Sequence, residues 1–329
     1  MLRAGAEVSG PGPDDIKADD MVWIPGGTFR MGSNRHYPEE APVHRATVDG
    51  FWMDRTPVTN RQFKAFVNAT GHVTTAQIPP DPEQYPGAVP HMIYAGSLVF
   101  VPPRRVTNLS DWSQWWVFLK DANWRHPRGP KSNLVGLDDH PVVHVTYADA
   151  LAYAKWADKD LPTEAEWEFA ARGGLDGEDY AWGNALTPGG AQMANIWQGN
   201  FPVKNLCEDG YESTSPVTAF PPNGYGLYDM IGNVWEWTSD WWSAKHEADA
   251  AKPCCVPFNP RGGPETASFD PCQPEVHIPR KVLKGGSHLC APNYCRRYRP
   301  AARHAEAVDT STSHVGFRCV AREPERFAE

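Results

Sequence analysis

Residues 281–320 read KVLKGGSHLCAPNYCRRYRPAARHAEAVDTSTSHVGFRCV and are the most informative part of the chain. Cys290 and Cys295 lie five residues apart in this stretch. On a helix that spacing would separate the two side chains by about 140°, and on a straight strand they would face opposite sides. Pro292 between them disfavours a continuous helix. A turn in a loop is therefore the arrangement that would bring the two sulfurs together.

The cysteine pair lies in a basic region, because residues 276–305 contain lysines and arginines but no Asp or Glu. Positive surroundings lower the pKa of a thiol and favour the thiolate, which is the form that attacks or binds a metal. The same pattern is compatible with a plain disulfide, or with two buried thiols whose neighbouring arginines pair with carboxylates elsewhere. The spacing alone leaves these alternatives open.

The rest of the composition is that of a globular protein. The chain has 329 residues, of which 41% are hydrophobic and 22% are charged, which is long enough for a sizeable core. Its net charge of -9 argues against general nucleic-acid binding. Mean hydropathy is -0.53, and the absence of an apolar run of about 20 residues predicts no membrane span. The first 17 residues have no apolar h-region, so we expect no secretory signal.

Two further features concern loops and cysteines. The chain contains 28 Gly, 32 Pro and 14 Trp, which indicates many loops held by large aromatic side chains. Seven cysteines, an odd number, do not predict a complete disulfide framework.

Local patterns predict few regular elements. We expect strand, turn and strand over MVWIPGGTFRMGS (residues 21–33) and a second strand region over residues 44–53. Three capping boxes predict short helices that begin after Thr59, Thr146 and Thr163, with Gln62, Asp149 and Glu166 as the reciprocal partners. The stretches 73–135 and 243–280 are interpreted as irregular. Nothing marks a linker, so one domain with many loops is predicted.

The motif GGSHLCAPNYCRRYRPAAR, followed by GFRC, resembles the active-site region of the formylglycine-generating enzyme, or sulfatase-modifying factor, family. The resemblance continues through WIPGGTFRMGS, LPTEAEWEFAARGG, YAWGN, ANIWQGNFP and PPNGYGLYDMIGNVWEWTSDWW, and so covers about residues 21–322. It implies a single α+β domain of low regular secondary structure with a C-type-lectin-like core. Residues 1–20 and 323–329 would be tails, the first of them flexible.

Members of this family use dioxygen and copper to oxidise the cysteine of a C-x-P-x-R segment in new type I sulfatases to Cα-formylglycine. By this resemblance Cys290 and Cys295 would bind Cu(I), a soft ion that prefers thiolates. Ser287 and Trp235 would line the pocket where oxygen reacts. Tyr294 and Arg297 would shape the groove for an unfolded or nascent sulfatase.

The resemblance also implies two structural calcium sites. The first maps onto Asn195, Ile196, Asp209 and Tyr211, and the second onto Asp229, Gly232, Val234 and Glu236. Calcium takes 6–8 oxygen ligands and readily uses backbone carbonyls. The spacing by itself does not predict calcium, and solvated carboxylates or helix caps explain the same residues.

Several positions depart from the family pattern. His314 stands where Asn is usual, and Ala291 follows Cys290 where some members carry His. Cys319 lacks the partners found in secreted members, which fits a reducing cytoplasm. Tyr294 occupies the Arg position of the segment that starts at Cys290, so this chain does not carry the substrate motif there. We expect a cytoplasmic monomer.

Other interpretations remain at this stage. Trp235 could be plain core, and Arg297 could be a structural ion pair. His140 and His144 share a strand face but are interpreted as structural. A zinc cluster could draw on Cys254, Cys255 and Cys272 with His246 or His277. An iron-dependent sulfoxide synthase and a non-catalytic, calcium-stabilised lectin-like module are the alternative functions.

Overall fold

The computed structural model describes residues 20–85, 89–246 and 256–323. It confirms the three predicted helices, α1 (Asn60–Thr70), α2 (Tyr147–Trp156) and α3 (Glu164–Arg172). Each helix has a threonine N-cap that forms a capping box. The threonine side chain accepts from the backbone N–H of the third helical residue, and the side chain of that residue accepts from the backbone N–H of the threonine. Two of them end at a glycine in the left-handed region, Gly71 after α1 and Gly173 after α3.

Within the described residues, the strands are short and form five separate sheets. The three-stranded sheet has the order β1-β4-β13 and the four-stranded sheet the order β11-β10-β9-β12, while β2-β3, β5-β6 and β7-β8 are two-stranded. The strands are β1 (Met21–Ile24), β2 (Gly27–Met31), β3 (His44–Val48), β4 (Phe51–Asp54), β5 (Gly96–Phe100), β6 (Trp116–Lys120), β7 (Gly199–Asn200), β8 (Lys204–Asn205), β9 (Trp235–Trp241), β10 (Arg280–Lys284), β11 (Arg303–Ala307), β12 (Val315–Gly316) and β13 (Val320–Ala321). Short 3-10 turns are η3 (Pro38–Glu40), η4 (Thr75–Gln77), η5 (Pro82–Gln84), η6 (Pro90–Met92), η7 (Trp112–Gln114), η8 (Pro188–Gly190) and η10 (Glu265–Ala267).

The strand region predicted over residues 44–53 is in fact two strands in different sheets. β3 pairs with β2, whereas β4 pairs with β1 and β13. The chain turns between them at Gly50, where a Cβ atom would lie 2.4 Å from the Trp23 ring. The single run is therefore broken by a tight approach that only glycine allows.

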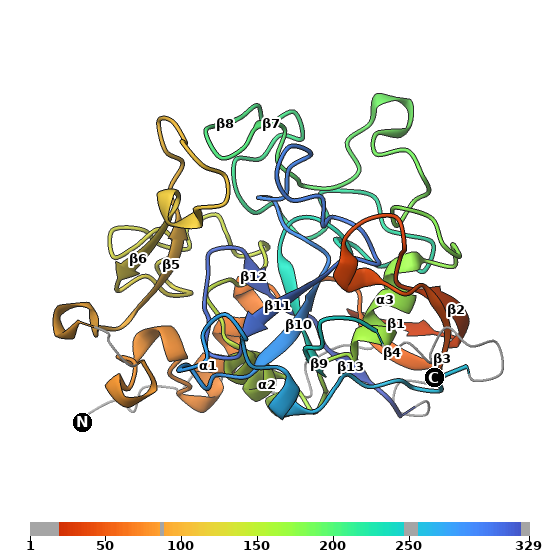
Figure 1. Ribbon diagram of the computed structural model, residues 1–329, viewed down its shortest axis with the longest axis horizontal. Helices are drawn as coiled ribbons and strands as arrows, with labels where there is room; N and C mark the ends of the chain where they lie inside the picture. Colours follow the sequence, from red (N-terminus) through yellow and green to blue (C-terminus); the bar gives the residue numbers. More distant parts are fainter. Residues whose placement is uncertain (1–19, 86–88, 247–255, 324–329) are drawn as a thin grey trace, which may run out of the picture.

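The region 73–135, which we interpreted as irregular, contains the β5–β6 hairpin. Gly96–Phe100 pairs antiparallel with Trp116–Lys120, and the hairpin stands to the left in Figure 1. Its connecting loop, residues 101–115, is longer than the loops that mark hairpins in sequence. The pairing is therefore decided by contacts that local sequence does not show.

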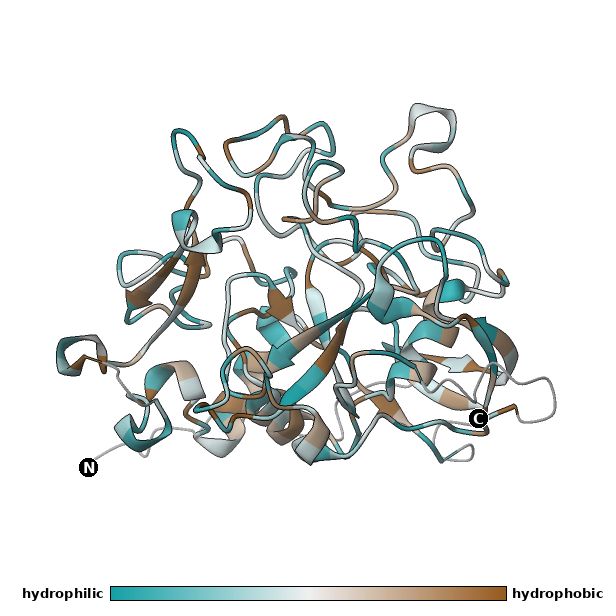
Figure 2. Ribbon diagram, viewed as in Figure 1, coloured by the Kyte–Doolittle hydropathy of each residue, from teal (hydrophilic) through white to brown (hydrophobic). Residues whose placement is uncertain are grey.

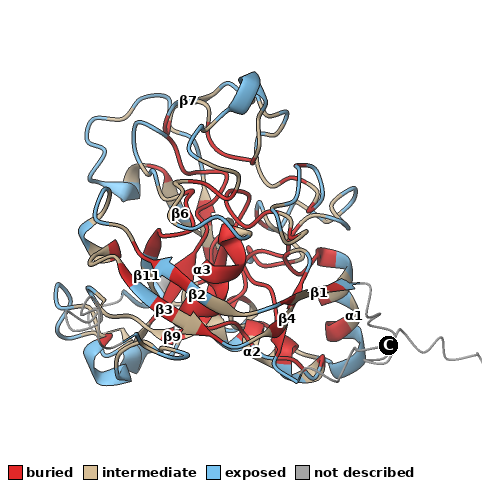
Figure 3. Ribbon diagram, turned by 90° about the vertical axis from the view of Figure 1, so that its right-hand side faces the viewer, coloured by how far each residue is buried: buried red, intermediate tan, exposed pale blue. Residues whose placement is uncertain are grey.

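The four-stranded sheet and α3 form the centre of the molecule. α3 contacts β9 and β10 on one side and β2 and β3 on the other (Figures 1 and 3). The core packed around them is rich in aromatic rings, including Trp167, Trp237 and Phe317. In Figure 2 the strands of the β5–β6 hairpin are mostly brown, whereas β10 and β11 also carry teal, hydrophilic residues. The predicted α+β, loop-rich single domain is confirmed.

A buried ion-pair cluster, here called the Lys284 cluster, joins α3 to the sheet. The Lys284 ammonium on β10 lies 3.0 Å from Glu168 and 3.5 Å from Glu164, both on α3. Arg172 binds Glu168 at 2.7 Å, and Arg303 on β11 binds Glu164 at 2.8 Å. All five side chains are almost wholly buried. Because buried charges require partners, the cluster fixes these elements against one another.

In the described part of the chain, no helix combines the length and the apolarity that crossing a membrane requires.

The Lys284 cluster should make stability depend on acid pH. Burial alone would raise the pKa of Glu168, but Lys284 and Arg172 outweigh it and lower the pKa to about 2. The lowered pKa contributes about 3 kcal/mol to the free energy of unfolding above about pH 4.5, the ordinary pKa of this carboxyl. This contribution is lost as the pH falls toward 2. Glu168→Gln should lower the free energy of unfolding at pH 7 by about 3–5 kcal/mol and flatten that acid limb. Urea unfolding followed by circular dichroism from pH 7 to pH 2 measures both effects, and parallel curves for the two proteins would contradict the assignment.

Candidate active site

The candidate site lies on the loop that connects β10 to β11, residues 285–302, here called the cysteine loop. In Figure 1 this loop rises from the sheet toward the β7–β8 region. Gly286 at its start has φ +72°, and a Cβ there would lie 2.9 Å from the Arg297 carbonyl. Glycine thus lets the two ends of the loop touch, which folds the segment between them into a compact turn.

The two cysteines of the loop meet as predicted. The Cys290 and Cys295 sulfurs are 3.2 Å apart, well beyond the roughly 2.05 Å of a disulfide. Cys290 is buried, and its N–H donates to the Ser287 carbonyl at 2.9 Å. Cys295 is partly accessible. The site therefore presents two free cysteines, one buried and one partly accessible.

The two sulfurs differ in their electrostatics. The hydrogen bond from Cys290 and the charge of Arg297 lower the pKa of Cys295 to about 6, although its burial opposes them. Burial raises the pKa of Cys290 well above its ordinary value. At neutral pH the pair is therefore one thiolate, on Cys295, and one thiol that donates to it. Thiolates are the nucleophilic and metal-binding form of cysteine.

Arg297 is held beside the thiolate by the distant segment 33–43. Its Nη1 lies 4.0 Å from the Cys295 sulfur, and its Nη2 and Nε bind the Glu39 carboxylate at 2.5 and 3.2 Å. The Tyr37 ring lies 3.9 Å from the guanidinium carbon. Neither Tyr37 nor Glu39 was predicted from sequence, because more than 250 positions separate them from Arg297 and no local pattern links them.

A cluster of aromatic rings lies next to the cysteines. Tyr294, which is 38% exposed, stacks on Phe201 at 4.5 Å and meets Trp115 edge-on at 5.6 Å. Trp115 and Phe201 belong to a second buried cluster that includes Ala291. Ala291 is fully buried there, which explains a small residue at this position. Phe201 was within the quoted ANIWQGNFP motif, but only the structure shows that it supports Tyr294.

The predicted oxygen-pocket residues are buried near the loop. Ser287 is fully buried, and its hydroxyl accepts from the Leu289 N–H at 3.2 Å. Trp235 begins β9 and belongs to the same core cluster as Cys290. Its indole stacks on the His304 ring at 5.6 Å. The structure therefore shows Trp235 as core packing, and its role in the oxygen pocket stays a prediction.

His314 is anchored as a neutral ring near Trp235. Its carbonyl accepts the Trp235 N–H at 2.9 Å, its Nδ1 lies 2.6 Å from the Thr312 hydroxyl, and its ring lies 4.8 Å from that of Trp116. Burial lowers the pKa of His314 well below its ordinary value. The histidine therefore occupies this position as an uncharged aromatic group.

The residues of the first calcium set converge in part. The Ile196 carbonyl and the Asp209 carboxylate both accept from the Gln198 amide nitrogen, at 2.5 and 2.8 Å. This N–H₂ group stands where a cation shared by the two oxygens would lie. Asn195 instead donates to the Ser213 carbonyl at 2.8 Å, and the Tyr211 N–H donates to Asp209 at 3.0 Å. The set fits a cation if the Gln198 amide turns away.

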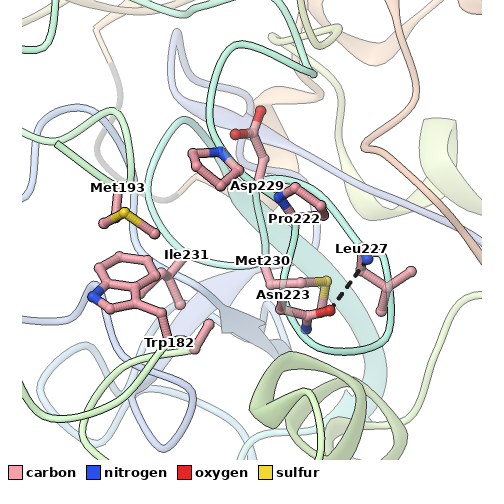
Figure 4. A pocket seen from close by; sticks show the side chains of 10 residues that line it. Trp182, Met193, Pro222, Asn223, Leu227, Asp229, Met230 and Ile231 are labelled. Atoms are coloured by element: carbon pink, nitrogen blue, oxygen red, sulfur yellow. Dashed lines mark hydrogen bonds between the residues drawn. The ribbon is translucent and has the colours of Figure 1, made fainter. Parts of the chain in front are cut away.

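In the second calcium set, one buried oxygen lacks a partner. Asp229 lines a cavity of ≈ 20 Å³, large enough for about one water molecule (Figure 4). Its Oδ1 is buried with no hydrogen-bond partner among the described residues, and burial raises its pKa to about 7. The Glu236 carboxylate, by contrast, accepts hydrogen bonds from Arg318 and from the Trp167 indole, both at 2.7 Å. Asp229 fits a cation better than Glu236 does.

The other histidines and cysteines follow the structural interpretation. His144 contacts the Ser97 hydroxyl at 2.7 Å and the Pro127 carbonyl at 2.9 Å, and His140 contacts Thr214 at 3.0 Å. Within the described ranges, no three His, Cys, Asp or Glu side chains are grouped as a metal site. For the zinc hypothesis, Cys254 and Cys255 lie outside the described residues, and Cys272 is exposed and free.

Comparisons with known proteins show what this chain is similar to. Residues 6–323 match the model of the sulfatase-modifying factor enzyme 1-like domain. The chain is 52% identical to formylglycine-generating enzyme of Mycobacterium tuberculosis over 303 residues, which is 92% of this chain and 97% of that protein. It is 44% identical to the Mus musculus enzyme of the same name, covering 97% and 80%. PvdO from Pseudomonas aeruginosa has a similar fold, with a TM-score of 0.61 at 23% identity over 92% and 94% of the chains.

The cysteine pair makes a prediction about thiol reactivity. In metal-free, reduced protein, iodoacetamide should modify Cys295 with a half-maximal rate near pH 6, because the lowered pKa leaves the thiolate present above that pH. Cys207 is the internal control, since burial and nearby acidic groups raise the pKa of its thiol. Arg297→Gln should shift the Cys295 midpoint upward. Peptide mass spectrometry at successive pH values reads both sites, and equal midpoints for Cys295 and Cys207 would contradict the thiolate assignment.

Proposed function

This chain belongs to the family of sulfatase-modifying factor enzyme 1-like domains, and on that premise we propose that it oxidises a sulfatase cysteine to Cα-formylglycine. The observation that carries the proposal is the reduced pair Cys290–Cys295, with sulfurs 3.2 Å apart on a loop that is partly open to solvent. We infer that the substrate segment is C-x-P-x-R, presented by an unfolded or nascent polypeptide, and that dioxygen is the oxidant.

The donor set of the pair fits copper(I). The two sulfurs, with no further His, Cys, Asp or Glu grouped with them as a metal site in the described residues, favour a soft ion. The lowered pKa of Cys295 favours its thiolate. When bound, copper(I) would supply the dioxygen chemistry that side chains lack. Cys290 and Cys295 would hold the ion, and Cys290 would lose its remaining proton on binding.

The surrounding residues suggest how the chain would present its substrate. Arg297 offsets the negative charge of the Cys295 thiolate, so a second thiol can approach at lower electrostatic cost. Tyr294, fixed on Phe201, offers an exposed ring for the substrate chain. Ser287 and Trp235 are both buried, and we propose that they line the pocket where oxygen reacts. The substrate segment must be extended, because its cysteine has to reach sulfurs that lie within a loop.

Conversion of a peptide tests the proposal. A C-x-P-x-R peptide incubated with the protein, Cu(I), a thiol reductant and oxygen should lose its thiol and gain an aldehyde, which mass spectrometry detects. Cys290→Ser and Cys295→Ser should each abolish turnover, because each removes a ligand. Cys207→Ser, which changes a free cysteine outside the site, is the matched control. Turnover by Cys295→Ser equal to that of the parent protein would refute the assignment of the pair.

We further propose that calcium stabilises the fold at one or both oxygen-rich sets. The buried, unpartnered Asp229 oxygen and the paired Ile196 and Asp209 oxygens support this. Millimolar Ca²⁺ should raise Tm relative to the EDTA-treated protein, by an amount that corresponds to about 2.7 kcal/mol at a concentration 100 times Kd. Asp229→Asn and Asp209→Asn separate the two sites. A Tm unchanged by Ca²⁺ in calorimetry of the parent protein would contradict the proposal.

A further inference from the structure

The arginines of the cysteine loop and the following strand differ in their partners. Arg297 binds Glu39, Arg299 binds Glu40, and Arg303 binds Glu164. Arg296 is exposed, and no described carboxylate lies within ion-pair distance of it. It is therefore the arginine of this run whose charge remains available to a binding partner.

Arg296 is nevertheless held in place. Its backbone N–H donates to the Tyr37 hydroxyl at 3.0 Å. Burial would lower the pKa of its guanidinium, but the interactions with Tyr298 and Tyr180 raise it. The Tyr180 and Tyr298 rings are buried and stack at 6.2 Å with an interplanar angle of 9°. Two packed rings thus lie beside the guanidinium. A charged group fixed in this way loses little freedom when it binds a ligand.

The position of Arg296 places this charge next to the cysteine pair. It follows Cys295 directly, so the two Cα atoms are about 3.8 Å apart. The guanidinium therefore lies within the length of a few extended residues of the pair, where a polypeptide whose cysteine reaches the pair can meet it. The planar guanidinium fork matches a carboxylate.

We propose that Arg296 binds an acidic side chain of the substrate polypeptide, within a few residues of the target cysteine, and so helps to determine which polypeptides are accepted. The inference rests on the proposed function, because it assumes that a polypeptide cysteine is the substrate. An exposed pair of this kind contributes modestly, so we expect a three- to tenfold effect on KM, equivalent to about 0.7–1.4 kcal/mol. The effect should weaken as salt screens the charges.

A peptide series tests the inference. Each peptide contains C-x-P-x-R and carries Asp, Asn or Lys at one position on either side of the cysteine. In the parent protein, Asp at one or two positions should lower KM three- to tenfold at low salt, and the preference should shrink at 0.5 M NaCl. Arg296→Gln should abolish the preference. Arg296→Glu should reverse it, so that Lys at the same position becomes the preferred residue.

Controls separate the charge effect from a structural one. Arg61→Gln removes an exposed arginine on α1 that pairs with Asp139, and should keep the Asp preference. Binding of fluorescent peptides with Ser in place of the target cysteine, measured by anisotropy on metal-free protein, should show the same order of affinities. Reversal by charge exchange is not expected from a loss of folding, so it supports a direct contact.

The outcomes distinguish this inference from the proposed function. Conversion of all peptides with equal KM for Asp and Asn would overturn the role of Arg296 and leave the activity in place. Conversion of none of them would overturn the proposed function. In that case the anisotropy series still decides whether Arg296 prefers an acidic peptide, and equal affinities for the Asp and Asn forms would overturn the inference.

Discussion

The Lys284 cluster is the constraint on which the rest of the structure depends. Its members come from α3, β10 and β11, so the ion pairs join the helix to both strands that flank the cysteine loop. Each charge in it would be costly if left alone in the interior, and the elements must therefore keep their relative positions for all of them to be paired. A protein with few and short regular elements gains from this a rigid base beneath a loop.

The arginines from Arg303 back to Arg296 extend that base toward the surface. Arg303 and Arg299 are buried and paired, Arg297 is partly buried and shared between Glu39 and Cys295, and Arg296 is exposed. Carboxylates of the 33–43 segment and α3 balance the first three charges. The cysteine pair therefore lies beside the point where arginines paired within the fold give way to the exposed Arg296, which has no described carboxylate partner.

Local sequence was sufficient where local interactions decide the structure. Thr59, Thr146 and Thr163 defined the starts of the helices because a capping box closes within three residues. For Cys290 and Cys295, Pro292 and the spacing argued against a helix and left a turn as the arrangement that could bring the sulfurs together, which the structure shows. Sequence did not reveal the β5–β6 hairpin, the division of residues 44–53 between two sheets, or the support of Arg297 by Glu39. These depend on partners far away in the chain, and from one sequence they leave no periodic or motif signal.

The distant partners also explain why one loop can hold two unlike thiols. Cys290 is buried in the core, and burial raises the pKa of its thiol. The hydrogen bond from Cys290 and the charge of Arg297 lower the pKa of Cys295. Glu39 and Tyr37 fix the guanidinium at a distance from which it can act on the sulfur, so the asymmetry of the pair depends on a segment that lies more than 250 residues earlier. The acid–base character of the site is therefore a property of the assembled fold, and the two-cysteine motif by itself would not produce it.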